Sequence, residues 1–183
     1  WSGDSPRAFE FSQRATGFQV EFDARIWPRL TEAFGALQPG NRIFILMADG
    51  PGPTFEDVMP GSGCSVARIF LRRFEAYTLA HELTHALLDL NFSIAACDNS
   101  EKLWMHEATA TWAQHYVYRP ANRGHEQDTA PWYLNHPERS INTHDRSGRS
   151  PAYGAYLWFL HLAGQGNDAS LVRDAWDRGA GVT

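Results

Sequence analysis

The sequence predicts an α+β fold in which a small mixed N-terminal sheet packs on one long helix and a mostly helical C-terminal part follows. Three observations lead to this prediction. Short apolar or alternating runs, typical of strands, precede residue 72. A strongly apolar helical pattern spans residues 75–91, and helical periodicity dominates after it. We therefore expect a single domain over residues 1–183, with the sheet part at about 1–91 and the helical part at about 92–183.

Composition limits the class of protein. The chain has 183 residues, of which 43 % are hydrophobic and 13 % aromatic, which favours a packed domain over a disordered segment. The net charge is −5 and the arginines are scattered apart from the pair Arg72-Arg73, so we expect no nucleic-acid partner. No apolar run reaches the roughly 18 residues that a membrane span requires, so we expect none in this chain.

The first two elements follow from apolar spacing. Apolar and polar residues alternate within residues 9–22, most clearly at 18–22, and this period predicts a half-buried strand. Apolar residues then recur at helical spacing over residues 26–37, with Pro28 near the start and Pro39 beyond the end. This second pattern predicts an amphipathic helix.

Two further strands are expected before the long helix. Residues 42–48 form an apolar run bounded by turn residues, which predicts a buried strand that is central in the sheet. Residues 49–63 are rich in Gly and Pro and predict a loop. Residues 65–71 return to apolar and β-branched types and predict an edge strand. The resulting sheet would support the helix at 75–91.

The C-terminal part is expected to contain three helices. Asp98 resembles an N-cap for a helix over residues 101–118, with Pro120 beyond its end. Ser150 and Pro151 are typical of the cap and first residue of a helix. They predict an apolar helix that ends at Gly164, and a last short helix follows Asn167-Asp168. Between these helices, residues 119–150 show no sustained periodicity, which predicts a long irregular segment that shapes a cleft.

The helix at 75–91 contains the pattern H-E-x-x-H, formed by His81, Glu82 and His85. Residues four apart share one face of a helix, so both imidazoles can bind one metal ion. Glu82 lies about 100° around the axis from His81, near a metal-bound water but poorly placed as a ligand. Zinc suits this set because it accepts imidazole ligands and lowers the pKa of bound water to about 7. The pattern therefore predicts one Zn²⁺ per chain.

A third ligand is expected on the next helix, where residues 104–110 read W-M-H-E-A-T-A. Together with H-E-x-x-H, this stretch resembles the gluzincin metallopeptidases, the thermolysin-like group. In that group a helix roughly twenty residues further on carries a liganding Glu in a W-x-x-E-G-x-A-like stretch. The resemblance covers residues from about 75 to 118, and Ala108 stands where the group commonly has Gly.

The resemblance implies a zincin-like fold and zinc-dependent hydrolysis of a peptide or protein substrate. His81, His85 and Glu107 would be the metal ligands, and Glu82 the general base that takes a proton from the zinc-bound water. His106 is the rival third ligand, since imidazole binds zinc well in general. The chain has no G-x-M-E-N-type amine-binding motif, which favours an endopeptidase over an exopeptidase.

Two parts of the site stay open at this point. Thermolysin-like enzymes have an Asp four residues after the liganding Glu, where this chain has Thr111, so Thr111 or Asp89 could orient a metal-bound histidine. Several gluzincins stabilise the oxyanion with a downstream Tyr, which implies Tyr153 as a catalytic residue. Three other side chains remain alternatives for that role: Tyr156, His136 and His144.

The cysteines bear on where the protein matures. Cys64 and Cys97 could form one disulfide in an oxidising compartment, although two buried free thiols are the alternative. Together with a start at Trp1 that resembles a processed chain, they favour a secreted or periplasmic protein.

A second function is also compatible with the sequence, namely a non-hydrolytic zincin-like module that binds protein or glycan and keeps zinc as a structural prop. The intact Glu82 favours the enzyme, because such a module would not need a base.

Overall fold

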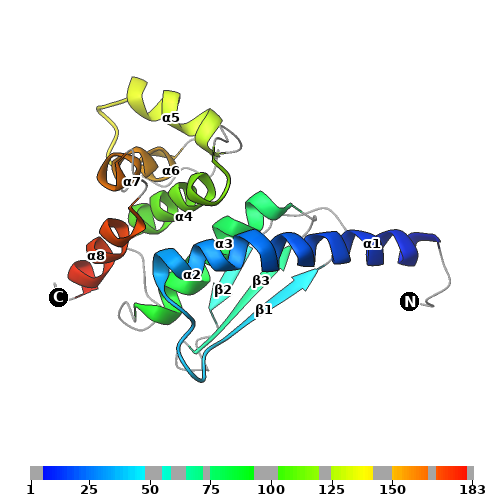
Figure 1. The fold of residues 1–183 in the computed structure, drawn as a ribbon. Helices are drawn as coiled ribbons and strands as arrows, with labels where there is room; N and C mark the ends of the chain where they lie inside the picture. Colours follow the sequence, from blue (N-terminus) through cyan, green and yellow to red (C-terminus); the bar gives the residue numbers. More distant parts are fainter. Residues whose placement is uncertain are drawn as a thin grey trace.

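The computed structural model describes residues 6–47, 55–58, 65–71, 75–92, 103–119, 125–141, 150–164 and 168–180. Helices predominate among them, and three strands form a small sheet (Figure 1). In chain order the elements are α1 (Pro6–Glu21), the π-helix η1 (Phe22–Ile26), α2 (Trp27–Phe34), β1 (Arg42–Met47), β2 (Phe55–Val58), β3 (Val66–Leu71), α3 (Ala76–Asn91), α4 (Leu103–Val117), α5 (His125–Asn135), α6 (Pro151–Gly154), α7 (Tyr156–Ala163) and α8 (Ala169–Ala180).

The sheet is mixed, as expected, but its strand order differs from the prediction. The order is β1-β3-β2, with β1 parallel and β2 antiparallel to β3. The prediction that β1 is central and β3 lies at the edge was therefore wrong. Exposure explains the difference: Phe44 and Leu46 on β1 are 47 % and 42 % exposed, whereas Ala67, Ile69 and Leu71 on β3 are fully buried. An apolar run alone does not tell a strand buried on both faces from one buried on a single face.

Strand β2 corrects the prediction of a continuous loop over residues 49–63. Residues 55–58 read Phe-Glu-Asp-Val, and the two acidic residues have low strand propensity. Their strand conformation comes from pairing with β3, in which Phe55 lies opposite Phe70 and Val58 lies opposite Ala67. Such long-range pairing overrides the local turn signals from neighbouring Gly and Pro.

The strand expected within residues 9–22 was also wrong, because this segment is helical: it lies in α1 up to Glu21, and Phe22 begins η1. In a strand, Phe18, Val20 and Phe22 would share one buried face. In the structure Val20 is 62 % exposed, while Phe18 and Phe22, four residues apart, both pack against the core. The helix continues through η1 into α2, where the Trp27 N–H donates to the carbonyl of Phe22. The short alternation at 18–22 was compatible with either period, and packing at helical spacing decided between them.

Helix α3 lies at the centre of the molecule, and its position agrees with the helix expected at 75–91. It packs on β2 and β3 on one side and contacts α2 and α4 on others (Figure 1). Leu79, Leu83, Leu87 and Leu88 are essentially inaccessible to solvent. The sheet therefore supports α3, and α4 runs against it, within the range expected for the next helix.

The C-terminal helices agree with the prediction except in the segment at 119–150. That segment includes α5, which packs against α6 although Pro131 lies inside it. Proline removes a backbone donor and interrupts the helical sequence pattern, so the helix was not recognisable from periodicity. Ser150 caps α6 as expected, and its hydroxyl accepts a hydrogen bond from the Ala152 N–H at 3.3 Å. The expected single helix after it is divided at Ala155 into α6 and α7.

The remaining boundaries follow local signals. Gly164 ends α7 with a φ of 63°, and Asp168 accepts a hydrogen bond from the Ser170 N–H at the start of α8.

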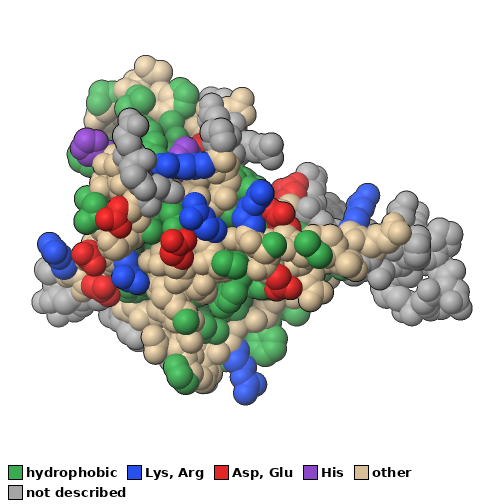
Figure 2. Space-filling view, in the orientation of Figure 1, with side chains coloured by type: hydrophobic (Ala, Val, Ile, Leu, Met, Phe, Trp, Pro, Cys, Tyr) green, Lys and Arg blue, Asp and Glu red, His purple; other side chains and the backbone are tan. Residues whose placement is uncertain are grey.

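Four residues named in the sequence analysis lie outside the described residues: Cys64, Cys97, Asp98 and His144. Within the described ranges, no helix combines the length and apolar character needed to cross a membrane. On the face drawn in Figure 2, acidic and basic side chains lie near one another.

Candidate metal centre

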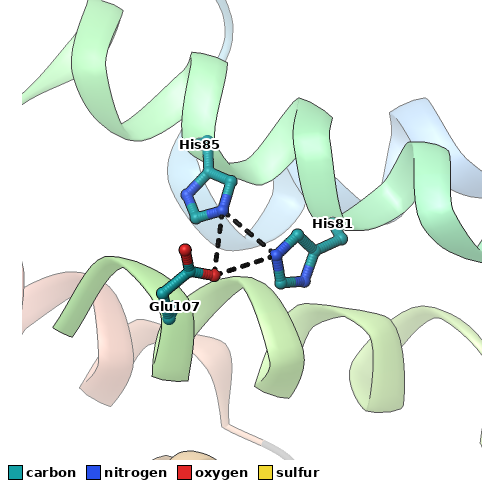
Figure 3. A group of neighbouring side chains, drawn as sticks. All are labelled: His81, His85 and Glu107. Atoms are coloured by element: carbon teal, nitrogen blue, oxygen red, sulfur yellow. Dashed lines mark hydrogen bonds and ion pairs between the residues drawn. The ribbon is translucent and has the colours of Figure 1, made fainter. Parts of the chain in front are cut away.

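Three side chains from two helices bring their ligand atoms together (Figure 3). His81 and His85 extend from α3, and Glu107 extends from α4. The Nε2 atoms of the two histidines are 3.1 Å apart, and Oε2 of Glu107 lies 3.1 Å from the His81 Nε2 and 3.4 Å from the His85 Nε2. The group is therefore a nearly equilateral triangle of metal-ligating atoms.

The packing of α3 against α4 produces this convergence. His81 and Glu107 are 5 % and 9 % exposed, and the His85 side chain is 13 % exposed. Ala108, Ala110 and Thr111 on α4 are fully buried, and such small side chains let two helices approach closely. Glu107 can then reach the histidine pair with its short side chain.

The triangle fits a tetrahedral metal ion. Zinc binds imidazole and carboxylate ligands at about 2.0–2.2 Å, which places the ligand atoms about 3.3–3.5 Å from one another. The observed separations of 3.1, 3.1 and 3.4 Å are close to this spacing. Hydrogen bonds alone cannot account for all three contacts of the triangle, because the two Nε2 atoms carry at most two protons between them. The group could therefore hold a metal ion.

The electrostatic environment keeps Glu107 ionised. Burial by itself would raise the pKa of Glu107, but the charge of His85 and hydrogen bonds from both histidines lower that pKa well below its ordinary value. Glu107 is thus a carboxylate at neutral pH, which is the form that binds a metal.

Glu82 and Tyr153 lie next to the triangle. The Tyr153 ring stacks on the His81 ring, with centroids 5.9 Å apart and planes at 28°, and its hydroxyl hydrogen-bonds Glu107. Burial raises the pKa of Tyr153 well above its ordinary value, and the charges of Glu107 and Glu82 raise it further. Tyr153 is therefore a neutral donor at physiological pH. Glu82 is 8 % exposed, and it is not a member of the three-residue group.

His106, the rival third ligand, has other partners. Its Nε2 lies 3.4 Å from Oδ1 of Asp89, and its ring stacks on His85 at 5.7 Å with planes at 14°. Trp176 from α8 contacts the same imidazole edge-on at 5.0 Å. Glu107, and not His106, completes the ligand triangle among the described residues. His106 instead packs behind one of the ligands.

The side chains that were alternatives for orienting a ligand, or for stabilising the oxyanion, have different surroundings. Asp89 pairs with His106, whereas the buried Thr111 hydroxyl has no hydrogen-bond partner within the described ranges. The Nδ1 of His136 lies 2.7 Å from the Trp132 carbonyl, and its ring stacks on Trp132. Burial, and secondarily the charge of Glu126, raise the pKa of Tyr156 to about 12. Of these tyrosines, Tyr153 is the one that contacts the triangle.

Sequence reasoning missed one buried polar cluster. The Glu126 carboxylate accepts a hydrogen bond from the Tyr77 hydroxyl and lies 2.9 Å from Nδ1 of His115. Its three members come from α5, α3 and α4, and no motif in the sequence links them. Glu126 also stands in a segment whose helix was not predicted.

Comparison with known proteins adds no relative to this picture. No protein-family model matches the chain, and no curated protein or solved structure matches it. The function is therefore inferred from the site itself.

Proposed function

We propose that this chain is a zinc-dependent metallopeptidase of the gluzincin type, and that it acts as an endopeptidase on a peptide or protein substrate. The observation that carries the proposal is the buried triangle of His81, His85 and Glu107, whose spacing suits one tetrahedral zinc ion. A structural zinc site usually has four protein ligands, whereas three protein ligands leave a position for water or substrate.

The neighbouring side chains support hydrolysis over simple binding. Zinc in such a site lowers the pKa of bound water to about 7 and polarises a carbonyl. Glu82, which follows His81 on α3, would take the proton released at the centre and pass it to the leaving amine. Tyr153, kept neutral by its surroundings, would donate a hydrogen bond to the developing oxyanion. The general base, the metal ligands and the oxyanion donor are thus different side chains.

The variant Glu82→Gln tests the proposal. The amide is nearly isosteric, so the variant should keep one zinc per chain by metal analysis and lose about 10²- to 10⁴-fold in peptide hydrolysis. Glu138→Gln, at a side chain that is 64 % exposed, is the matched control and should behave as the parent. His85→Ala should lose both zinc and activity, because two protein ligands rarely hold zinc tightly.

Two outcomes would reject the proposal that the chain is a peptidase. In the first, Glu82→Gln cleaves a peptide library as fast as the parent. In the second, the zinc-loaded parent cleaves no peptide, and a chelator changes nothing but metal content. The chain would then be a zincin-like binding module with zinc as a prop. The proposal also includes a secreted or periplasmic location, which a titration finding two free thiols at Cys64 and Cys97 would oppose.

A further inference from the structure

The cluster of Glu126, Tyr77 and His115 joins three helices through one carboxylate. Glu126 is 3 % exposed, and its two oxygens contact different partners. Oε1 accepts a hydrogen bond from the Tyr77 hydroxyl, and Oε2 lies 2.9 Å from Nδ1 of His115. A buried carboxylate is unfavourable unless such contacts compensate its lost hydration. The first turn of α5 is therefore held to α3 and α4 at a defined point.

The two partners stand on the helices that carry the metal ligands. Tyr77 precedes His81 by one turn of α3, so both lie on nearly the same face. His115 follows Glu107 by about two turns of α4. Gln114 ties these helices together beside the cluster, since its Nε2 donates to the Tyr77 carbonyl at 3.1 Å. Glu126 is thus connected to the same rigid pair of helices as the metal centre.

Helix α6, which carries Tyr153, packs against both α5 and α4. A Cβ at Gly154 of α6 would lie 2.3 Å from the Tyr133 Cβ and 2.9 Å from the Thr129 carbonyl oxygen. Helices α5 and α6 therefore touch with no room for a larger residue. Thr129 and Tyr133 follow Glu126 by three and seven residues, so all three lie along one side of α5. The side of α5 that bears Glu126 is also the side that packs on α6.

Tyr153 directly precedes Gly154, and its ring stacks on His81 while its hydroxyl bonds Glu107. We infer that Glu126 is a positioning residue for Tyr153: it fixes α5 on α3 and α4, and α5 fixes α6 so that the Tyr153 hydroxyl is held beside the metal centre. The catalytic consequence rests on the proposed peptidase function. The placement of Tyr153 does not, and it can be measured without a substrate.

A double-mutant cycle on kcat tests the catalytic consequence. Glu126→Ala should lower kcat about 10- to 100-fold with a much smaller change in KM, because a misplacement of about 1 Å has effects of this size. In a Tyr153→Phe background the same change should lower kcat by no more than about twofold, since coupled residues are not additive. Asp128→Ala, an exposed carboxylate in the same first turn of α5, is the matched control and should leave kcat unchanged.

Fluorine NMR tests the placement itself. A 3-fluorotyrosine incorporated at position 153 should give one resonance in the parent and in Asp128→Ala. In Glu126→Ala this resonance should shift or broaden. If Glu126→Ala does not fold, Tyr77→Phe removes one of the two contacts with almost no change in volume, and it should move the resonance in the same direction.

The two measurements separate failure of this inference from failure of the proposed function. An unmoved resonance in a folded Glu126→Ala or Tyr77→Phe protein would overturn the inference, whatever the activity. If Glu126→Ala lowers kcat equally in the parent and in the Tyr153→Phe background, the inference is overturned as well. If the parent cleaves no peptide while the resonance moves as expected, the peptidase proposal fails and the positioning role of Glu126 stands.

Discussion

The Nε2 atom of His81 and the Oε2 atom of Glu107 lie 3.1 Å apart, although the two residues belong to different helices. Both side chains are buried, and His85 completes the triangle from the turn after His81. The contact depends on the packing of α3 on α4, so it reports on the tertiary structure as well as on the metal site. A change at either residue should therefore affect both metal binding and folding, so the two effects have to be measured separately.

The choice of third ligand gives the first prediction. Glu107→Gln should weaken zinc binding by more than the roughly 10- to 100-fold that loss of an outer partner causes. His106→Asn should weaken it no more than that, because His106 contacts Asp89 and His85 from behind the site. Competition titration with a chromophoric chelator measures both affinities. Tight zinc binding by Glu107→Gln, together with its loss in His106→Asn, would reverse the assignment.

The packing between α5 and α6 gives the second prediction. Gly154→Ala should lower the free energy of unfolding by about 1–3 kcal/mol, as overpacked sites do, because its Cβ would collide with Tyr133 and the Thr129 backbone. Gly17→Ala is the contrasting control, since a Cβ there meets nothing within 4 Å. It lies inside α1 and should be neutral or stabilising by up to about 1 kcal/mol. Urea denaturation compares the two, and equal stabilities would contradict the described α5–α6 contact.

The candidate metal site was predictable because most of its residues are close together in the sequence. His81, Glu82 and His85 stand within five residues of one helix, and their spacing alone predicts a shared metal ion. Glu107 required the gluzincin resemblance, because nothing in the spacing alone separates it from the adjacent His106. The helices at 75–91 and 101–118 were predictable for a similar reason, since both have long apolar patterns without internal Pro or Gly.

The elements that were missed depend on contacts distant in sequence. Strand β2 exists through pairing with β3, and the edge position of β1 reflects which strand the rest of the fold covers. Glu126 is a further example, because acidic residues in the first turn of a helix are usually solvated. Its burial follows from tertiary contacts with Tyr77 and His115, which no local pattern encodes.

Tyr156 predicts how stability depends on alkaline pH. Burial, and then the negative charge of Glu126, raise its pKa from 10.0 to about 12 in the folded protein. The unfolded chain ionises near pH 10, so it binds fewer protons than the folded chain between these values. The contribution of Tyr156 to the free energy of unfolding should therefore be fully present below about pH 10. It should decrease as the pH rises toward about 12. Urea denaturation of the parent and Tyr156→Phe measures this, and parallel pH profiles would contradict it.

The oxyanion donor gives the last prediction, because two tyrosines three residues apart differ in their surroundings. The Tyr153 ring stacks on His81 and its hydroxyl bonds Glu107, whereas the carboxylate that raises the pKa of Tyr156 is that of Glu126. Tyr153→Phe should lower kcat by about 10²- to 10³-fold, the usual effect of removing one oxyanion donor, with little change in KM. Tyr156→Phe should cause a much smaller decrease.

Both variants are to be measured at saturating zinc, because loss of the hydrogen bond to Glu107 should weaken metal binding by up to about 100-fold. Tyr116→Phe is the control for removal of a buried phenol, since its ring packs on Trp112 at 5.1 Å and its hydroxyl is near Glu32. It should retain the kcat of the parent. A larger decrease in Tyr156→Phe than in Tyr153→Phe would assign the donor to Tyr156 instead, because the hydroxyl that binds the oxyanion is the one whose removal slows the chemical step.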